Sequence, residues 1–395
     1  MNRTALFLAR RLQWRSEGRN KKSPSVTIAI SGVALAVAVM MVSVAVVLGF
    51  KHEVKSRLLN INDALTIRAY NPDGESRTLN TTELSALITL PENATLEPRT
   101  ESAAILKTED DFVAVKLEGN TDAINPDSIG SIAISTITAQ RLALNIGDKI
   151  PAYFFINERI RVRPLRIDSI YTTGIDEHDA TIAYCSPRML GALLGMNNDE
   201  ASYAGIRGLT QDQIEPLANN IHSQLLSAYY TGATSTAYGI TTILQTDAVY
   251  FTWLDLLDTN VVVILTLMAA VASFTLISSL FIIILERVKT IGLLKSLGAT
   301  NITIRRTFML MAERLVLKGL LIGNIIAIAL ILIQGATHIV PLDQANYYVD
   351  YVPVELPITA ALALNAGTLL LSWIVLILPA LIIARISPAA TMRYE

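Results

Sequence analysis

Cysteine and histidine are scarce in this chain, and their scarcity excludes several kinds of site. The single cysteine, Cys185, cannot form a disulfide within the chain. Any domain of this chain that lies outside the cytosol must therefore be stabilised by its own apolar core and not by disulfides. The histidines are scattered, and no His-Glu-x-x-His pattern for a catalytic zinc ion is present. Only Asp176–Asp179 places a histidine among carboxylates, and there we expect an acidic surface turn rather than a metal site.

The phosphate-binding pattern Gly-x-x-x-x-Gly-Lys-Ser/Thr is absent as well, so the chain is not expected to bind ATP itself. An enzyme that acts within the membrane needs ionisable groups deep in the bilayer. Here Glu313, Arg314 and Lys318 stand only at one end of a long apolar run. We therefore predict a non-catalytic protein that binds no cofactor and no metal ion.

Charge is missing from four long stretches of a sequence in which 52% of the residues are hydrophobic. About 20 consecutive apolar residues span the hydrocarbon core of a bilayer, so each stretch is long enough to cross it as a helix. The third stretch, Gly319–Leu342, is the least uniformly apolar, because it carries Asn324, Gln334 and His338. The uncharged stretches are Val26–Phe50, Val261–Leu285, Gly319–Leu342 and Ile358–Ala384.

Lysine and arginine near the ends of these stretches predict their orientation, because positive residues remain on the cytoplasmic side. Residues 1–24 carry seven of them, whereas the loop 343–357 carries none. Both termini are therefore expected in the cytoplasm, with residues 51–258 in the periplasm of a bacterial inner-membrane protein. That segment has 16 Lys and Arg against 27 Asp and Glu, a net charge of −11, which is unfavourable for binding nucleic acid.

The predicted fold is an α-helical membrane protein with four transmembrane helices and a large α+β periplasmic domain between helices one and two. Alternating segments such as Phe112–Leu117 and Lys149–Ile156 indicate strands, and the apolar spacing of Gln211–Ser227 indicates a helix. The expected order is a cytoplasmic amphipathic segment (1–24), helix one (25–50), the periplasmic domain with helical stalks (51–258), helix two (259–285), a cytoplasmic coupling helix and loop (286–306), helix three (308–340), a short periplasmic loop (341–357), helix four (358–384) and a cytoplasmic tail (385–395).

The stretch 286–300, ERVKTIGLLKSLGAT, joins the second and third transmembrane segments. At about 100° per residue, its leucines and Ile291 fall on one side, and Gly292 falls on the basic side. Gly298 follows the last periodic residue, where a helix C-terminal cap is expected. The pattern predicts a short amphipathic helix, either lying on the bilayer or docking a partner that pushes on it.

Polar residues within the first two transmembrane segments are few and small. Such residues allow ordinary close packing of helices. The alternative is an apolar groove between the two helices that opens toward lipid and accepts an acylated substrate. The candidate groove residues are Val39, Met40, Ser43, Val47, Phe50, Leu267, Phe274 and Ser278.

The stretch 286–300 closely resembles the coupling segment of the ABC-transporter permeases that include MacB, FtsX, LolC and LolE. Further likeness to LolC and LolE lies at Gly49-Phe50 with Glu53, at Tyr347–Val354, and at the C-terminal close from Pro379 onward. The resemblance implies ATPase contact at Glu286, Arg287, Lys289, Ile291, Gly292, Leu294, Lys295, Gly298 and Ala299. It makes Gly292→Trp a variant expected to uncouple transport while leaving the fold intact.

The resemblance also implies the partners. These are a LolD-like cytoplasmic ATPase that binds ATP and Mg²⁺, a second permease chain that is identical or homologous, triacylated lipoprotein substrates and a LolA-like periplasmic carrier. LolC-type chains carry an extended hairpin, the hook, that grasps the carrier. The corresponding stretch here, Tyr153–Leu165, leaves only residues 157–159 for a turn, so a tight hairpin is expected instead. Other members of the superfamily leave two alternatives open, namely FtsX-like control of a cell-wall hydrolase and MacB-like export.

Overall fold

The computed structural model describes residues 24–382 except residues 72, 75, 121–129, 157 and 198. The predicted amphipathic segment 1–24, apart from Pro24, and the tail 385–395 lie outside the described residues. The chain divides into two compact units. The helical unit comprises residues up to His52, Trp253–Pro341 and residues from Tyr351 onward; the β-rich unit comprises Glu53–Thr252 and Leu342–Asp350.

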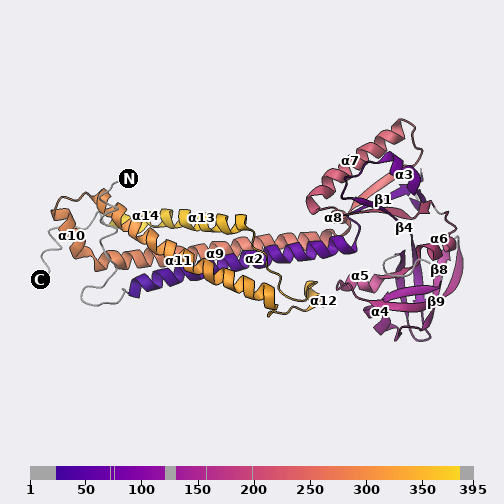
Figure 1. The fold of residues 1–395 in the computed structure, drawn as a ribbon, viewed down its shortest axis with the longest axis horizontal. Helices are drawn as coiled ribbons and strands as arrows, with labels where there is room; N and C mark the ends of the chain where they lie inside the picture. The colour runs from indigo at the N-terminus through magenta and orange to yellow at the C-terminus, as the bar shows by residue number, and fades with distance from the viewer. Residues whose placement is uncertain are drawn as a thin grey trace. The chain divides into compact units, whose positions relative to one another are not determined.

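Four helices in the described part of the chain are long and apolar enough to cross a membrane. They are α2 (Pro24–Ile61), α9 (Ala248–Glu286), α11 (Asn301–Thr337) and α13 (Ile358–Val375), the last followed by α14 (Ile377–Ile382). Helix α2 continues 11 residues beyond Phe50, and α9 begins 13 residues before Val261, so both helices are longer than the uncharged stretches within them. All four run through the helical unit in Figure 1.

Helix α2 supplies the largest share of the buried residues in the helical unit and packs closely against α11. Gly319 and Gly323 lie four residues apart on α11, hence on one face of that helix. A Cβ atom on Gly323 would lie 2.6 Å from the carbonyl oxygen of Ala34, and one on Gly319 would lie 2.8 Å from Cβ of Val33. The two glycines therefore allow a backbone approach that any side chain would prevent.

A reciprocal pair of amide hydrogen bonds joins α11 to α13. Asn324 Nδ2 donates to Asn365 Oδ1 at 2.7 Å, and Asn365 Nδ2 donates to Asn324 Oδ1 at 3.0 Å. Each amide also donates to a carbonyl oxygen one turn earlier on its own helix. Asn324 of the third apolar stretch and Asn365 of the fourth therefore satisfy each other where lipid offers no hydrogen bonds.

A five-stranded antiparallel sheet forms one part of the β-rich unit. Its path is β13-β1-β12-β4, with β2 paired to the end of β1. Helix α7 (Gln211–Tyr230) packs on this sheet through Ile214, Ile221 and Leu225 (Figure 1). The strands are β1 (Leu65–Tyr70), β2 (Ser76–Arg77), β4 (Thr95–Arg99), β12 (Tyr203–Arg207) and β13 (Ala237–Thr242). A separate two-stranded sheet is formed by β3 (Leu79–Asn80), which precedes α3 (Thr81–Leu87), and β11 (Glu200–Ala201), which follows α6 (Pro187–Leu194).

A closed six-stranded barrel forms the second part, in the order β10-β6-β5-β8-β9-β7. Its interior is filled by fully buried side chains that include Leu106, Leu117, Phe154 and Ile167, and Cys185 is a free thiol buried in the same core. The strands are β5 (Glu101–Lys107), β6 (Phe112–Gly119), β7 (Ser131–Ser135), β8 (Lys149–Ile156), β9 (Arg159–Tyr171) and β10 (Ile182–Cys185).

Two short helices, α4 (Thr136–Arg141) and α5 (Asp176–Thr181), connect strands of the barrel. Helix α8 (Ile243–Thr246) follows β13, and α12 (Gln344–Tyr347) lies in the segment 342–350. Helix α4 is only six residues long. Ser135 caps its N-terminus by accepting from the Thr138 amide, and Ala143, with a φ of 51°, lies just beyond its end. Strand β10 begins at Ile182, directly after the last residue of α5.

The prediction that Asp176–Asp179 forms an acidic surface turn is wrong for Asp179, which is buried. This segment is the first turn of α5, and Asp179 is 1% exposed. Its carboxylate accepts hydrogen bonds from the Thr173 amide at 3.0 Å, the Thr173 hydroxyl at 2.6 Å and the Thr172 hydroxyl at 3.1 Å. Burial alone would raise the pKa of Asp179, but hydrogen bonds from Thr173 and Thr172 outweigh it and lower the pKa.

Asp179→Asn is expected to destabilise the β-rich unit by about 2 kcal/mol at pH 7, because an amide offers one oxygen to three donors. The folded pKa of Asp179 lies below its unfolded value of about 3.9. The ionised carboxylate therefore stabilises the fold above that value, and this contribution is lost as the pH falls through the folded pKa. Thermal unfolding of the detergent-solubilised chain between pH 7 and pH 3 should show a smaller pH dependence for Asp179→Asn. The exposed Asp176→Asn variant should match wild type; equal behaviour of the two variants would contradict the prediction.

Candidate functional site

Helix α10 (Val288–Ser296) stands between α9 and α11 at one end of the helical unit (Figure 1). Ile291 is fully buried in the core of the bundle, and Leu294 and Ala299 pack against that core. Leu293 and Leu297 instead point outward, with 60% and 76% of their surface exposed. The two leucines leave an apolar surface on the outer side of the helix.

The prediction of which residues share the apolar side of this helix is therefore partly wrong. An arc built at a constant angle placed all three leucines together with Ile291, whereas the structure buries Ile291 and exposes Leu293 and Leu297. Gly292, expected on the exposed basic side, is buried. A tryptophan at Gly292 would have to be fitted into the interior, so Gly292→Trp is expected to disturb the packing and cannot separate coupling from folding.

The expected cap at Gly298 is confirmed. Gly298 has a φ of +89°, its amide donates to the carbonyl of Lys295, and the Ala299 amide donates to the carbonyl of Leu294. This pair of bonds is a Schellman motif, which favours glycine because of the positive φ. Thr300 follows at once as the N-cap of α11, accepting from the Thr303 amide at 3.3 Å. The end of α10 and the start of α11 are thus joined by a tightly bonded turn.

The charged candidates lie around the start and the outer side of α10. Glu286 is the exposed last residue of α9, Arg287 is half-buried between the two helices, and Lys289 is exposed. Lys295 is half-buried near the C-terminus of α10, where a cation is favourable beside the last carbonyl groups. The structure therefore gathers the predicted coupling residues on one short segment, with the buried ones fixing it and the exposed ones available to a partner.

The candidate groove residues on α2 and α9 differ in exposure. Met40 and Phe50 are buried, whereas Leu267 and Phe274 are 56% and 73% exposed. Phe50 packs edge-to-face on Trp253 with ring centroids 5.6 Å apart. The remaining candidates, Val39, Ser43, Val47 and Ser278, are half-buried.

A further contact on α2 was not recognised from the sequence. The amide of Glu355 donates to the carbonyl of Ala45 at 2.9 Å, so the chain entering α13 lies directly across α2. A Cβ atom on Gly49 would lie 2.7 Å from the Glu355 nitrogen and 2.8 Å from Cα of Val354. Gly49 is thus a point of close backbone approach, and its role could not be read from the motif Gly49-Phe50 alone.

Comparison with known proteins shows what these features are similar to. The protein-family model described as FtsX-like permease C-terminal matches residues 262–388 of this chain, and this range includes α10 and α11. The lipoprotein-releasing system transmembrane protein LolC of Xylella fastidiosa strain Temecula1 is 23% identical over 93% of this chain and 93% of that protein. The chain is similar to LolC/LolE-type ABC permeases along most of its length and carries an FtsX-like permease domain. LolC of Neisseria meningitidis serogroup B is 22% identical over 96% of this permease and 97% of that protein.

Shorter and weaker likenesses accompany these matches. LolE of Haemophilus influenzae is 29% identical to the permease over 35% of each chain. The extracellular domain of the ABC-type transporter YknZ from Gram-positive bacteria covers 45% of the permease and all of that domain at 13% identity, with a TM-score of 0.30. A score of this size says nothing about the fold of the permease.

Proposed function

We propose that this permease extracts triacylated lipoproteins from the bacterial inner membrane for transfer to a periplasmic carrier, driven by ATP hydrolysis in a separate cytoplasmic ATPase. The observation that supports it most is the similarity to two LolC proteins along more than nine-tenths of the chain. In this proposal the permease is non-catalytic, and ATP and Mg²⁺ bind the LolD-like ATPase. A second permease chain, identical or homologous, completes the complex.

The proposed ATPase contact is the outer side of α10. Leu293 and Leu297 give it exposed apolar surface, and Lys289 adds positive charge beside them. Because Ile291 is fully buried and Gly298 closes a Schellman turn, a push on α10 would be passed to the bundle instead of being absorbed by a loose loop. This physical link supports mechanical coupling between ATP binding and the bundle.

The proposed topology follows from the distribution of lysine and arginine. Both termini and α10 would lie in the cytoplasm, and the acidic segment 51–258 would lie in the periplasm. In this arrangement one set of helices connects the ATPase side to the domain that meets the carrier. Helices α2 and α9 both continue beyond their uncharged stretches, which supports a continuous helical connection.

The proposed substrate accounts for the need for ATP. Each buried CH₂ of an acyl chain contributes about 0.8 kcal/mol to membrane binding, so three chains do not leave at a useful rate unaided. An apolar groove beside α2 and α9 would receive these chains during release. The hairpin β8–β9 pairs Ile156 with Arg159, so the described residues form a short hairpin at this place and no extended hook. The partner permease would then supply the carrier contact, or the carrier would dock elsewhere.

Depletion of this chain in its native cells tests the proposal. Acyl-labelled lipoproteins should accumulate in the inner-membrane fraction within a few generations and return to the outer membrane on re-expression. Unchanged lipoprotein distribution with a defect in cell-wall cleavage would favour the FtsX-like function. Unchanged distribution with loss of peptide or small-molecule export would favour the MacB-like function.

A further inference from the structure

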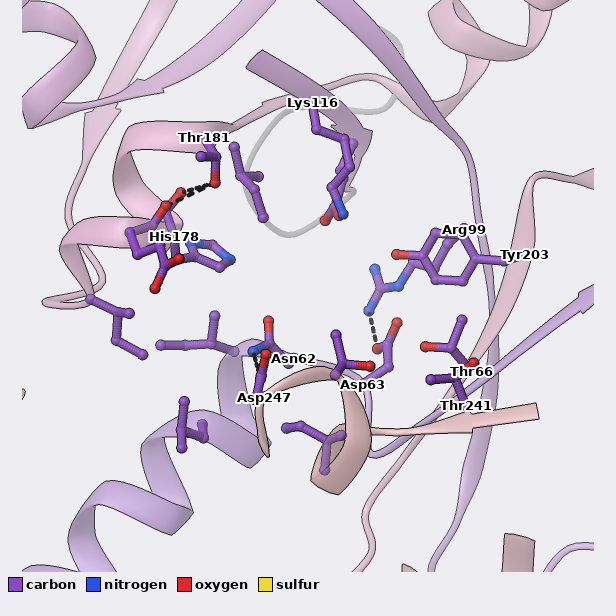
Figure 2. Close-up of a pocket in the computed structure, with 18 of the residues that line it drawn as sticks. Asn62, Asp63, Thr66, Arg99, Lys116, His178, Thr181, Tyr203, Thr241 and Asp247 are labelled. Carbon is purple, nitrogen blue, oxygen red and sulfur yellow. Dashed lines mark hydrogen bonds and ion pairs between the residues drawn. The ribbon is translucent and has the colours of Figure 1, made fainter. Parts of the chain in front are cut away.

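A cavity of about 540 Å³ lies within the β-rich unit, among the end of α2, the five-stranded sheet, the barrel and α5 (Figure 2). This volume is in the range of sites that hold small molecules. Unlike most such sites, this one is lined by many charged side chains. The coupling function described above uses none of them.

Basic groups line one side of the cavity. Arg99 on β4 and Arg207 on β12 both donate to Asp63, at 3.3 and 2.7 Å, and the Asp63 side chain is only 7% exposed. In the part of the chain that the structure describes, both side-chain hydrogen bonds of Arg99 use Nη2. Its Nη1 and Nε donors therefore remain for a ligand, and Figure 2 shows the guanidinium directed toward the centre of the cavity. Lys116 approaches from β6.

An unpartnered imidazole faces these groups from the opposite side. The His178 side chain on α5 is 8% exposed, and its Nδ1 is buried without a hydrogen-bond partner among the described residues. Its nearest carboxylate oxygen, Oδ1 of Asp179, is 3.8 Å from Nδ1, too far for a hydrogen bond. Figure 2 shows the ring pointing into the cavity. A buried polar atom with no partner is costly unless a bound molecule or water satisfies it.

Two of the four lining carboxylates, Glu177 and Asp247, stand on the same side as His178, whereas Asp63 and Glu118 lie beside the basic groups. Asp247 follows α8, where its Oδ2 accepts from Asn62 at 2.8 Å, and burial raises the pKa of its carboxyl group, with a further contribution from Glu177. Among the described lining residues, four Lys or Arg side chains are balanced by four Asp or Glu side chains. The cavity thus favours a ligand without net charge that carries a positive group at one end and a negative group at the other.

We propose that this cavity binds a small zwitterion of amino-acid or dipeptide size. The ligand carboxylate faces Arg99 and Lys116, and its ammonium group donates to Asp247 and approaches the ring nitrogen of His178 that points into the cavity. The proposal is independent of lipoprotein release, since it uses only the residues around the cavity of the β-rich unit.

Three dipeptide probes of similar size test this proposal against the full chain in lipid nanodiscs, by saturation-transfer NMR and equilibrium dialysis. They are alanyl-alanine, its N-acetyl form, which lacks the ammonium group, and its C-terminal amide, which lacks the carboxylate. Alanyl-alanine should bind at least tenfold more tightly than either derivative. Failure of all three to reach saturation, or equal binding of a derivative, would overturn the proposal.

Two variants locate the binding. His178→Phe keeps the ring volume but removes both ring nitrogens, and Asp247→Asn keeps the shape and the contact to Asn62 but removes the charge. Each should weaken alanyl-alanine binding at least tenfold. Asp168→Asn, on β9 and paired with Arg166 outside the cavity, makes the same change and should bind as wild type does. If His178→Phe does not fold, Asp247→Asn decides alone, and wild-type binding by that variant would contradict the assignment.

Discussion

Gly323→Val is expected to destabilise the helical unit by about 2 kcal/mol or more, since overpacking of a filled interior costs this much and a carbonyl oxygen cannot move aside as a side chain can. A Cβ atom at this position would lie 2.6 Å from the backbone oxygen of Ala34 and 3.0 Å from Cβ of Val37. Helices α2 and α11 would therefore have to separate, and the neighbouring contact of Gly319 with Val33 would open as well.

The matched control is Gly367→Val on α13, where a Cβ atom would meet nothing within 4 Å among the described residues. This variant should unfold within about 0.5 kcal/mol of wild type, as is usual for changes away from packed features. Detergent-titrated unfolding of the purified chain measures both. Equal stability of Gly323→Val and wild type would show that α2 and α11 do not pack at this distance.

Leu297→Glu is expected to abolish productive contact with the ATPase while leaving the permease folded. Leu297 is 76% exposed, so a charge there meets water in the isolated chain and alters its unfolding by no more than about 0.5 kcal/mol. In the proposed complex the same charge would be buried without a partner, which costs several kcal/mol. Co-purification of the ATPase and ATP-dependent lipoprotein release should each fall at least tenfold.

Two controls separate this effect from a general effect of charge. Leu297→Met keeps the apolar surface and should retain release, because volume-conserving apolar changes are well tolerated. Ile146→Glu introduces the same charge at a 64% exposed position of the β-rich unit and should retain ATPase binding. If Leu297→Glu co-purifies with the ATPase as wild type does, the outer side of α10 is not the contact.

The long apolar helices and the cap of α10 were predictable because they depend on local sequence. Four uncharged stretches identify helices by length alone, and Gly298 marks a conformation that few other residues adopt. The burial of Gly292 and the exposure of Leu293 were not predictable. On a helix of nine residues, the side that is covered depends on where neighbouring segments lie, and the apolar arc includes more residues than those neighbours cover.

The spacing of Gly319 and Gly323, four residues apart in an apolar helix, by itself indicates close helix packing. The partner of this pair on α2 could not be read, because nothing in Ile30–Val37 distinguishes one face from another. The cavity residues could not be predicted from the sequence either. Asp63, Arg99 and His178 belong to no motif, and only pairing between distant strands, such as β6 with β10, brings their elements together.

Reconstitution measures the proposed release most directly. The permease, co-purified with its ATPase and any second permease chain, is placed in liposomes that carry a triacylated lipoprotein, and ATP is added with a soluble periplasmic carrier. The proposal predicts that lipoprotein appears on the carrier only with ATP and Mg²⁺, and at least tenfold less with Leu297→Glu. ATP hydrolysis that proceeds without any lipoprotein on the carrier, and that lipoprotein does not alter, would contradict it.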